Sequence, residues 1–87
     1  MSQHDDQVYL KHMLDHAREA VEMVAGKTHA DLTQNRMLEL ALIRLVEIIG
    51  EAATRVGSDM KSSNPQVPWR EIIGMRNRLT HGYDTVD

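Results

Sequence analysis

The architecture of this chain follows from one stretch, LELALIRLVEIIGEAATRV at residues 38–56. Placed at about 100° per residue, most of its apolar side chains form one broad arc of a helix, and a second line lies on the far side. That second line consists of Leu40, Ile43, Gly50 and Thr54, with Glu47 among them. A helix with two packing faces needs a second covering surface. We therefore predict a homodimer in which the same helix of another copy covers this line.

The helix that contains this stretch is expected to span residues 31–56. Asp31, followed three residues later by Gln34, has the form of an N-cap with a capping box, and Gly57 follows the last apolar position. Upstream, residues 6–25 repeat apolar side chains with a helical period, which predicts a second long amphipathic helix. Two adjacent helices of this kind indicate an antiparallel pair.

A third helix is expected near the C-terminal end. A polar connector at residues 58–67, which can begin with a helical turn, leads to Pro68, and proline suits the first position of a helix. That helix is expected to end at Gly82. Residues 84–87 resemble the start of a fourth helix, and the chain stops there.

Size and composition set the fold class. The 87 residues allow one domain at most, and so short a chain buries a small share of its surface. There is no Phe, one Trp and two Tyr, so the core must come from aliphatic side chains and Met. We predict an all-α protein, a small antiparallel helical bundle. It forms a single domain over residues 1–87, with three main helices and a truncated fourth.

The sequence indicates neither a cofactor nor a membrane segment. Without cysteine there is no disulfide and no thiolate metal site, which fits a reducing compartment. No apolar run approaches the roughly 18 residues of a membrane helix, so we expect a cytoplasmic protein. His12 and His16 could hold a metal at their i,i+4 spacing, but they lie on the polar arc with no third histidine nearby. We expect no metal and no cofactor.

Charge is distributed unevenly along the chain. The formal net charge of -3 argues against a general nucleic-acid coat. In residues 55–81, however, only Asp59 and Glu71 oppose five basic residues, which are Arg55, Lys61, Arg70, Arg76 and Arg78. Such asymmetry can focus phosphate on one site. Arg70 and Arg78 are candidate substrate-binding residues.

Arg76 is the first candidate for a functional role. On the third helix it is predicted to project between Trp69 and Ile72, within the apolar arc, where a guanidinium is costly unless it is paired. One interpretation is a structural salt bridge to Glu47 or Glu51. The other is a phosphate site, for which a planar and permanently charged fork is well suited. The sequence leaves both open.

His81 is the second candidate. It follows Arg76 by five positions, about 140° around a regular helix, so the two converge only if the helix breaks near Gly82 or a partner chain completes the site. Asn77 could hydrogen-bond an imidazole nitrogen and fix its tautomer, and the Tyr83 hydroxyl would emerge beside the other groups. The structural alternative makes His81 a favourable cation at a helix C-terminus.

Three groups of residues carry a family resemblance. They are Ile48-Ile49-Gly50-Glu51-Ala52-Ala53, then Pro65 with Pro68-Trp69, and Arg76-Asn77-Arg78-Leu79-Thr80-His81-Gly82-Tyr83. Together they resemble the HEPN superfamily, specifically the HepT-like toxins encoded beside a minimal nucleotidyltransferase antitoxin (MntA). The similarity is strong from the second helix onward and loose in the first. It implies a dimerising helical bundle that acts as a metal-independent endoribonuclease.

The resemblance also implies roles for individual residues. The family's Arg-x4-His-x-Tyr signature maps onto Arg76, His81 and Tyr83, and Asn77 matches the polar residue after the arginine. Because RNA supplies its own nucleophile, the 2′-hydroxyl, His81 would move protons as general acid/base and Arg76 would stabilise the phosphorane, with Asn77 orienting. The two copies of the motif would line a cleft at the dimer interface. The nucleotidyltransferase would silence the toxin by transferring AMP to Tyr83, which adds bulk and negative charge.

A non-catalytic reading stands beside this one. Typical members of the family continue past the motif into a further helix, whereas this chain ends four residues after Tyr83. The acidic net charge and the short end favour a helical subunit that binds a nucleotidyltransferase partner or a nucleotide without cleaving RNA.

Overall fold

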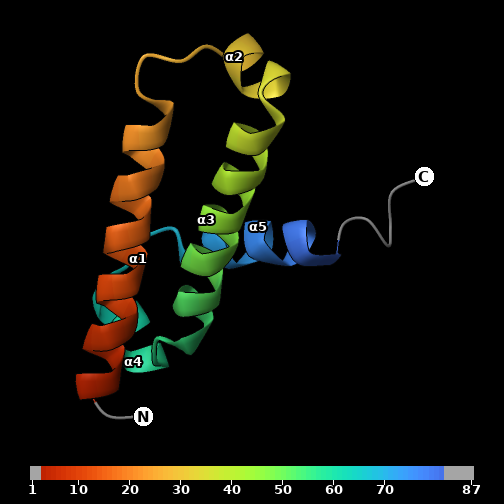
Figure 1. The fold of residues 1–87 in the computed structure, drawn as a ribbon. Coiled ribbons are helices and arrows are strands. Elements are labelled where there is room, and N and C mark those ends of the chain that lie inside the picture. The colour runs from red at the N-terminus through yellow and green to blue at the C-terminus, as the bar shows by residue number, and fades with distance from the viewer. Residues whose placement is uncertain (1–2, 82–87) are drawn as a thin grey trace.

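The computed structural model describes residues 3–81, and all regular structure in that range is helical (Figure 1). The elements are α1 (Gln3–Val24), α2 (His29–Gln34), α3 (Arg36–Arg55), α4 (Ser58–Ser63) and α5 (Trp69–His81). The predicted all-α bundle is therefore confirmed. The expected fourth helix at residues 84–87 and the expected end at Gly82 lie outside the described residues. No described helix has the length and apolar character needed to cross a membrane.

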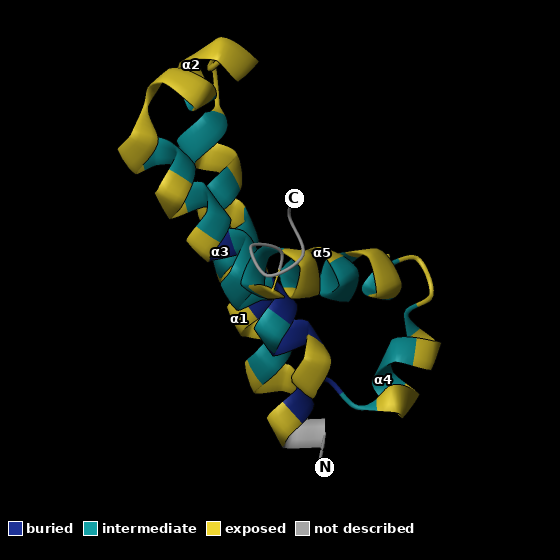
Figure 2. Cartoon of the chain, turned by 90° about the vertical axis from the view of Figure 1, so that its right-hand side faces the viewer, coloured by how far each residue is buried: buried dark blue, intermediate teal, exposed yellow. Residues whose placement is uncertain are grey.

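The three long helices form the body of the molecule. α1 and α3 lie side by side in opposite directions, and α5 crosses α3 on another side (Figure 1). The buried residues Met13, Ala52, Ala53 and Val56 form the core, where α1 meets the C-terminal half of α3 (Figure 2). Partly buried aromatic and aliphatic side chains of α5 close this core, among them Trp69. α3 is thus the central element, in contact with both other long helices.

The expected helix at 31–56 is two helices, which corrects the prediction. The capping box belongs to Thr28, whose hydroxyl accepts a hydrogen bond from the Asp31 backbone N–H at 3.1 Å. In return Asp31 Oδ2 accepts one from the Thr28 N–H at 2.9 Å. Asn35 then adopts an extended conformation, and its Oδ1 accepts from the Leu38 N–H at 3.0 Å. Asparagine here ends α2 and caps α3, because its short amide competes with the helical backbone bonds.

A buried carboxylate fixes the position of α4. Asp6 in the first turn of α1 is 6% exposed, and its Oδ1 accepts a hydrogen bond from the Gly57 backbone N–H at 2.9 Å. Gly57 is the N-cap residue of α4 and makes no side-chain cap of its own. The carboxylate of one helix therefore satisfies an N–H group at the start of another. The predicted helical turn after residue 57 is confirmed as α4.

The second apolar line of α3 is partly covered within the chain. Gly50 is buried and faces α5, so part of the surface assigned to another copy is occupied by the chain's own last helix. Leu40 remains 47% exposed, and Met37 and Val21 are exposed to 82% and 67%. These residues belong to the end of α1 and the start of α3, and Figure 2 shows that this part of the helix pair lies away from α5.

Candidate active site

Arg76 is held on α5 by a carboxylate of α3. Its Nη2 donates to Glu51 Oε2 at 2.5 Å, and its Nη1 donates to Asn77 Oδ1 at 2.8 Å. The Glu51 carboxylate also accepts from Arg55 Nη2 at 3.2 Å. Of the two expected acids, Glu51 is therefore the ion-pair partner. The Asn77 amide oxygen thus helps to orient the arginine, and the orientation of His81 by Asn77 stays a prediction.

The ion pair leaves much of the Arg76 donor capacity free. A guanidinium has five N–H donors, and the two recorded hydrogen bonds engage one at each terminal nitrogen. The side chain is 27% exposed, so it is shielded from water without being sealed off. A half-buried, oriented guanidinium with spare donors can bind an anion such as phosphate.

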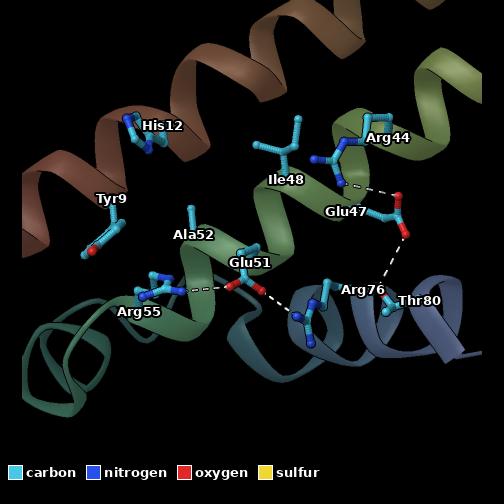
Figure 3. A pocket seen from close by; sticks show the side chains of 10 residues that line it. All are labelled: Tyr9, His12, Arg44, Glu47, Ile48, Glu51, Ala52, Arg55, Arg76 and Thr80. Atoms are coloured by element: carbon cyan, nitrogen blue, oxygen red, sulfur yellow. Dashed lines mark hydrogen bonds and ion pairs between the residues drawn. The ribbon is translucent and has the colours of Figure 1, made fainter.

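The guanidinium borders a cleft of about 480 Å³ between the three long helices (Figure 3). α1 contributes two aromatic rings on one wall, α3 contributes the floor and charged side chains, and α5 contributes the other wall. The lining residues are Tyr9, His12, Arg44, Glu47, Ile48, Glu51, Ala52, Arg55, Arg76 and Thr80.

A second carboxylate joins α3 to α5 at the other end of the cleft. Glu47 Oε2 accepts a hydrogen bond from Thr80 Oγ1 at 3.4 Å, and its Oε1 lies 3.9 Å from Arg44 Nη1. Counting the lining residues, three arginines against two glutamates give a cleft charge of +1 with His12 neutral. The cleft is thus locally basic in a chain whose formal net charge is -3. That contrast favours an anionic ligand at this place.

The other expected site residues lie elsewhere. His81 is exposed in the last turn of α5, and within residues 3–81 it is not one of the residues that line the cleft. Because α5 remains helical through His81, one chain does not bring it together with Arg76. Arg70 and Arg78 are exposed on α5 outside the cleft, and their substrate-binding role stays a prediction. Tyr83 lies outside the described residues.

The histidine pair of α1 is engaged locally. His16 Nδ1 donates to the backbone carbonyl of His12 at 2.7 Å, and the two rings meet edge to face with centroids 6.3 Å apart. Within the described part of the chain, no cluster of three or more His, Cys, Asp or Glu side chains could hold a metal.

The sequence did not predict that Tyr9, His12, Arg44 and Arg55 share this cleft, although it singled out His12 as a possible metal ligand and Arg55 as part of the basic region. Tyr9 and His12 are separated by three positions and so share a face of α1. Arg44 and Arg55 belong to a charged stripe with both glutamates, at spacings of three or four residues along α3. These spacings were a usable signal. They could not show that this face of α1 and this face of α3 line the same cleft, because that depends on how the two helices pack.

Comparison with known proteins identifies the family to which this chain belongs. The family model described as Ribonuclease HepT-like matches residues 13–87. The chain belongs to the HepT-like ribonuclease family. This confirms the expected HEPN, HepT-like assignment and the ribonuclease class of the enzyme. No solved structure gives a significant match.

Relatives of this HepT-like protein carry ribonuclease names. One from Methanocaldococcus jannaschii, provisionally named an RNase, is 36% identical over 87 residues, which cover all of this chain and 80% of the relative. Another from Caldanaerobacter subterraneus with the same provisional name is 37% identical, with 86% of this chain and 67% of the relative covered. "Probable ribonuclease HepT" of Thermococcus cleftensis is 37% identical, with 88% and 74% covered.

Proposed function

We propose that this chain is a metal-independent endoribonuclease and the toxin of a HEPN/nucleotidyltransferase toxin–antitoxin pair. One observation carries the proposal: a half-buried Arg76 guanidinium, fixed by Glu51 and Asn77, borders a basic cleft in a chain of the HepT-like family. Phosphate transfer needs oriented positive charge at the reacting phosphorus, and this geometry supplies it.

The reaction uses the nucleophile that RNA carries. The 2′-oxygen attacks the adjacent phosphorus as its proton passes to a base, and the bond from phosphorus to the 5′-oxygen breaks as that oxygen takes a proton. The products are a 2′,3′-cyclic phosphate and a free 5′-hydroxyl. His81 serves as the proton-transfer group, which an imidazole can do near neutral pH. Arg76 donates hydrogen bonds to the non-bridging oxygens of the phosphorane.

A second copy of the chain completes the site in this proposal. Arg76 and His81 point to different sides of α5, so a catalytic pair requires His81 from a partner protomer. Apolar side chains left exposed on α1 and α3, such as Val21, Met37 and Leu40, support a homodimer. Exposed Arg70 and Arg78 would then guide the RNA backbone toward the site.

Regulation by a nucleotidyltransferase antitoxin is the other part of the proposal. The nucleotidyltransferase would transfer AMP to the hydroxyl of Tyr83, two residues beyond His81. The added phosphate would repel the substrate phosphate, and the added adenosine would occupy space near the histidine. Mass spectrometry of toxin purified together with its antitoxin should find one AMP on Tyr83, and Tyr83→Phe should remain unmodified and active.

The test of the nuclease is cleavage of single-stranded RNA by the purified protein in EDTA. The unchanged protein should give 2′,3′-cyclic phosphate ends, and Arg76→Ala or His81→Ala should abolish cleavage. Arg36→Ala is a matched control, because Arg36 is 78% exposed and pairs with Glu39 of its own helix turn. Full cleavage by either of the first two variants would refute the assigned roles.

Mixing the two inactive variants tests the shared site. A heterodimer of Arg76→Ala with His81→Ala contains one site with both native residues and one with neither. If partner chains share each site, such a heterodimer should regain about half of the normal activity. No recovery in a heterodimer shown to form would mean that each site is built from one chain.

A non-catalytic subunit is the second candidate, favoured by the separation of His81 from the cleft. In that case purified protein would not cut RNA, while pulldown of the nucleotidyltransferase would survive His81→Ala. Loss of that pulldown, or cleavage that depends on His81, would remove this candidate.

A further inference from the structure

Two aromatic rings on α1 face the cleft and have no part in the mechanism above. Tyr9 and His12 lie on the wall opposite α5 (Figure 3), with ring centroids 6.3 Å apart and ring planes at 82°. Tyr9 is half-buried against the core, whereas His12 is exposed. The anchored tyrosine therefore provides a rigid ring, and the histidine presents a second ring beside it at the mouth of the cleft.

The floor between the two walls is apolar. Ile48 and Ala52 of α3 lie one turn apart and line the cleft between the aromatic wall and Arg76 (Figure 3). The cleft thus offers apolar and aromatic surface on α1 and α3, and it also offers three guanidinium groups whose ion pairs are with Glu47 and Glu51. A nucleotide likewise combines a flat, largely apolar base with an anionic phosphate.

The cationic groups of the cleft extend beyond Arg76. Arg44 and Arg55 line the same cleft, with side chains 72% and 55% exposed, and within residues 3–81 each forms one ion pair. Most of their N–H donors are therefore open to a ligand. The cleft volume of about 480 Å³ lies within the roughly 300–1,000 Å³ typical of small-molecule sites.

We infer that this cleft binds one nucleotide unit of single-stranded RNA, with the base against Tyr9 and His12 and the phosphate at Arg76. The inference rests on the proposed function for its choice of RNA as ligand. Stacking on aromatic side chains accepts any unpaired base, since every base has a π-face. We therefore expect RNA binding at this cleft to require unpaired bases and to depend little on the RNA sequence.

The test measures binding of a short single-stranded RNA oligonucleotide to full-length protein in the His81→Ala background, which prevents cleavage. His12→Ala and Tyr9→Leu should each weaken binding by about fivefold or more, the usual scale for one stacked base. Leucine keeps apolar volume at the half-buried position, and circular dichroism checks that each variant folds. His29→Ala, on α2 outside the cleft, is the matched histidine control and should bind normally.

Aromatic replacement separates stacking from other roles. His12→Phe and Tyr9→Phe should bind RNA within about twofold of the parent, because a ring remains at each position. Double-stranded RNA should bind at least tenfold more weakly than the single strand. Free AMP forms a second arm. The RNA oligonucleotide should bind more tightly than AMP, and tighter binding of AMP with the same dependence on Tyr9 and His12 would make a free nucleotide the ligand, so that the RNA assignment would fail.

Two outcomes keep this inference distinct from the proposed function. If the unchanged protein cleaves RNA but His12→Ala and Tyr9→Leu bind it normally, the nucleotide subsite is refuted and the nuclease stands. If the unchanged protein does not cleave, yet both substitutions still weaken RNA binding while His29→Ala does not, the subsite stands and the nuclease fails.

Discussion

Gly50 of α3 packs directly against the base of the Arg76 side chain of α5. A methyl group at position 50 would overlap Arg76 Cβ and would lie 2.7 Å from Arg76 Cγ and 3.3 Å from the Ile72 carbonyl oxygen. The next residue, Glu51, binds the guanidinium at the other end of the same side chain. Two consecutive residues of α3 therefore hold Arg76 at its root and at its tip.

Gly50→Ala should separate α3 from α5. The added methyl group has no space, so we expect a loss of about 1–3 kcal/mol in the free energy of unfolding and a large loss of RNA cleavage. Gly74→Ala is the matched control on α5, since the nearest atom to its new methyl group would be Arg78 Nη1 at 4.0 Å. It should gain roughly 0.5–1 kcal/mol from helix propensity. Urea unfolding of both variants checks this, and equal effects would contradict the close contact.

The ion pair between Glu51 and Arg76 should be energetically coupled. A double-mutant cycle with Glu51→Ala and Arg76→Ala should give a coupling of about 1–2 kcal/mol in unfolding free energy, because a half-buried cation loses its partner. The exposed pair of Arg36 and Glu39 is the comparison and should give about 0.5 kcal/mol or less. Similar couplings for both pairs would show that solvent screens Arg76 as fully as a surface residue.

Asp6→Ala should loosen α4. The variant removes the acceptor for the Gly57 N–H, and we expect a loss of about 1–2 kcal/mol in unfolding free energy. Asp15→Ala removes an exposed carboxylate from the same helix, one that pairs with Lys11, and should change stability by about 0.5 kcal/mol or less. Hydrogen exchange should locate the Asp6 effect in residues 57–63. An effect spread evenly over the chain would contradict a local cap.

Salt dependence of RNA binding can identify which arginines contact phosphate. Each contact with single-stranded nucleic acid contributes about 0.7 to the slope of log affinity against log salt. Arg44→Ala and Arg55→Ala should each reduce that slope by about this amount if the cleft is the binding surface. Arg70→Ala and Arg78→Ala test the outer side of α5 by the same titration. Slopes that change only for the latter pair would place the RNA outside the cleft.

Local sequence patterns predicted the long helices well. The apolar period gave α1 within a few residues, and Pro68 marked the start of α5. The break at Asn35 was missed because the predicted cap at Asp31 was joined to the apolar stretch at 38–56 across the polar residues 33–36. The capping residue before α2 is Thr28, three positions before the predicted one. Caps depend on single side chains, so a periodic pattern averages over them.

The site was predictable only in part. The sequence indicated that Arg76 needed a negatively charged partner and left open whether this was Glu47 or Glu51 of the neighbouring helix or a bound phosphate. It also contained a motif that resembles the HepT-like family. The comparisons confirm that the chain belongs to this family. It did not reveal the cleft positions of Tyr9 and His12.

The amino-acid sequence alone determined the helical class, the family and the need of the Arg76 guanidinium, on the apolar face of its helix, for a negatively charged partner. These follow from local hydrogen bonding, side-chain spacing and the cost of desolvating a charge. The tertiary structure decided which acid forms the pair, that Gly50 lets α5 approach closely, and that His81 stays outside the cleft. Those results depend on contacts between residues far apart in the chain, such as Glu51 and Arg76, 25 positions apart. The geometry with which α3 and α5 cross determines such contacts, and the sequence pattern of either helix does not specify that geometry.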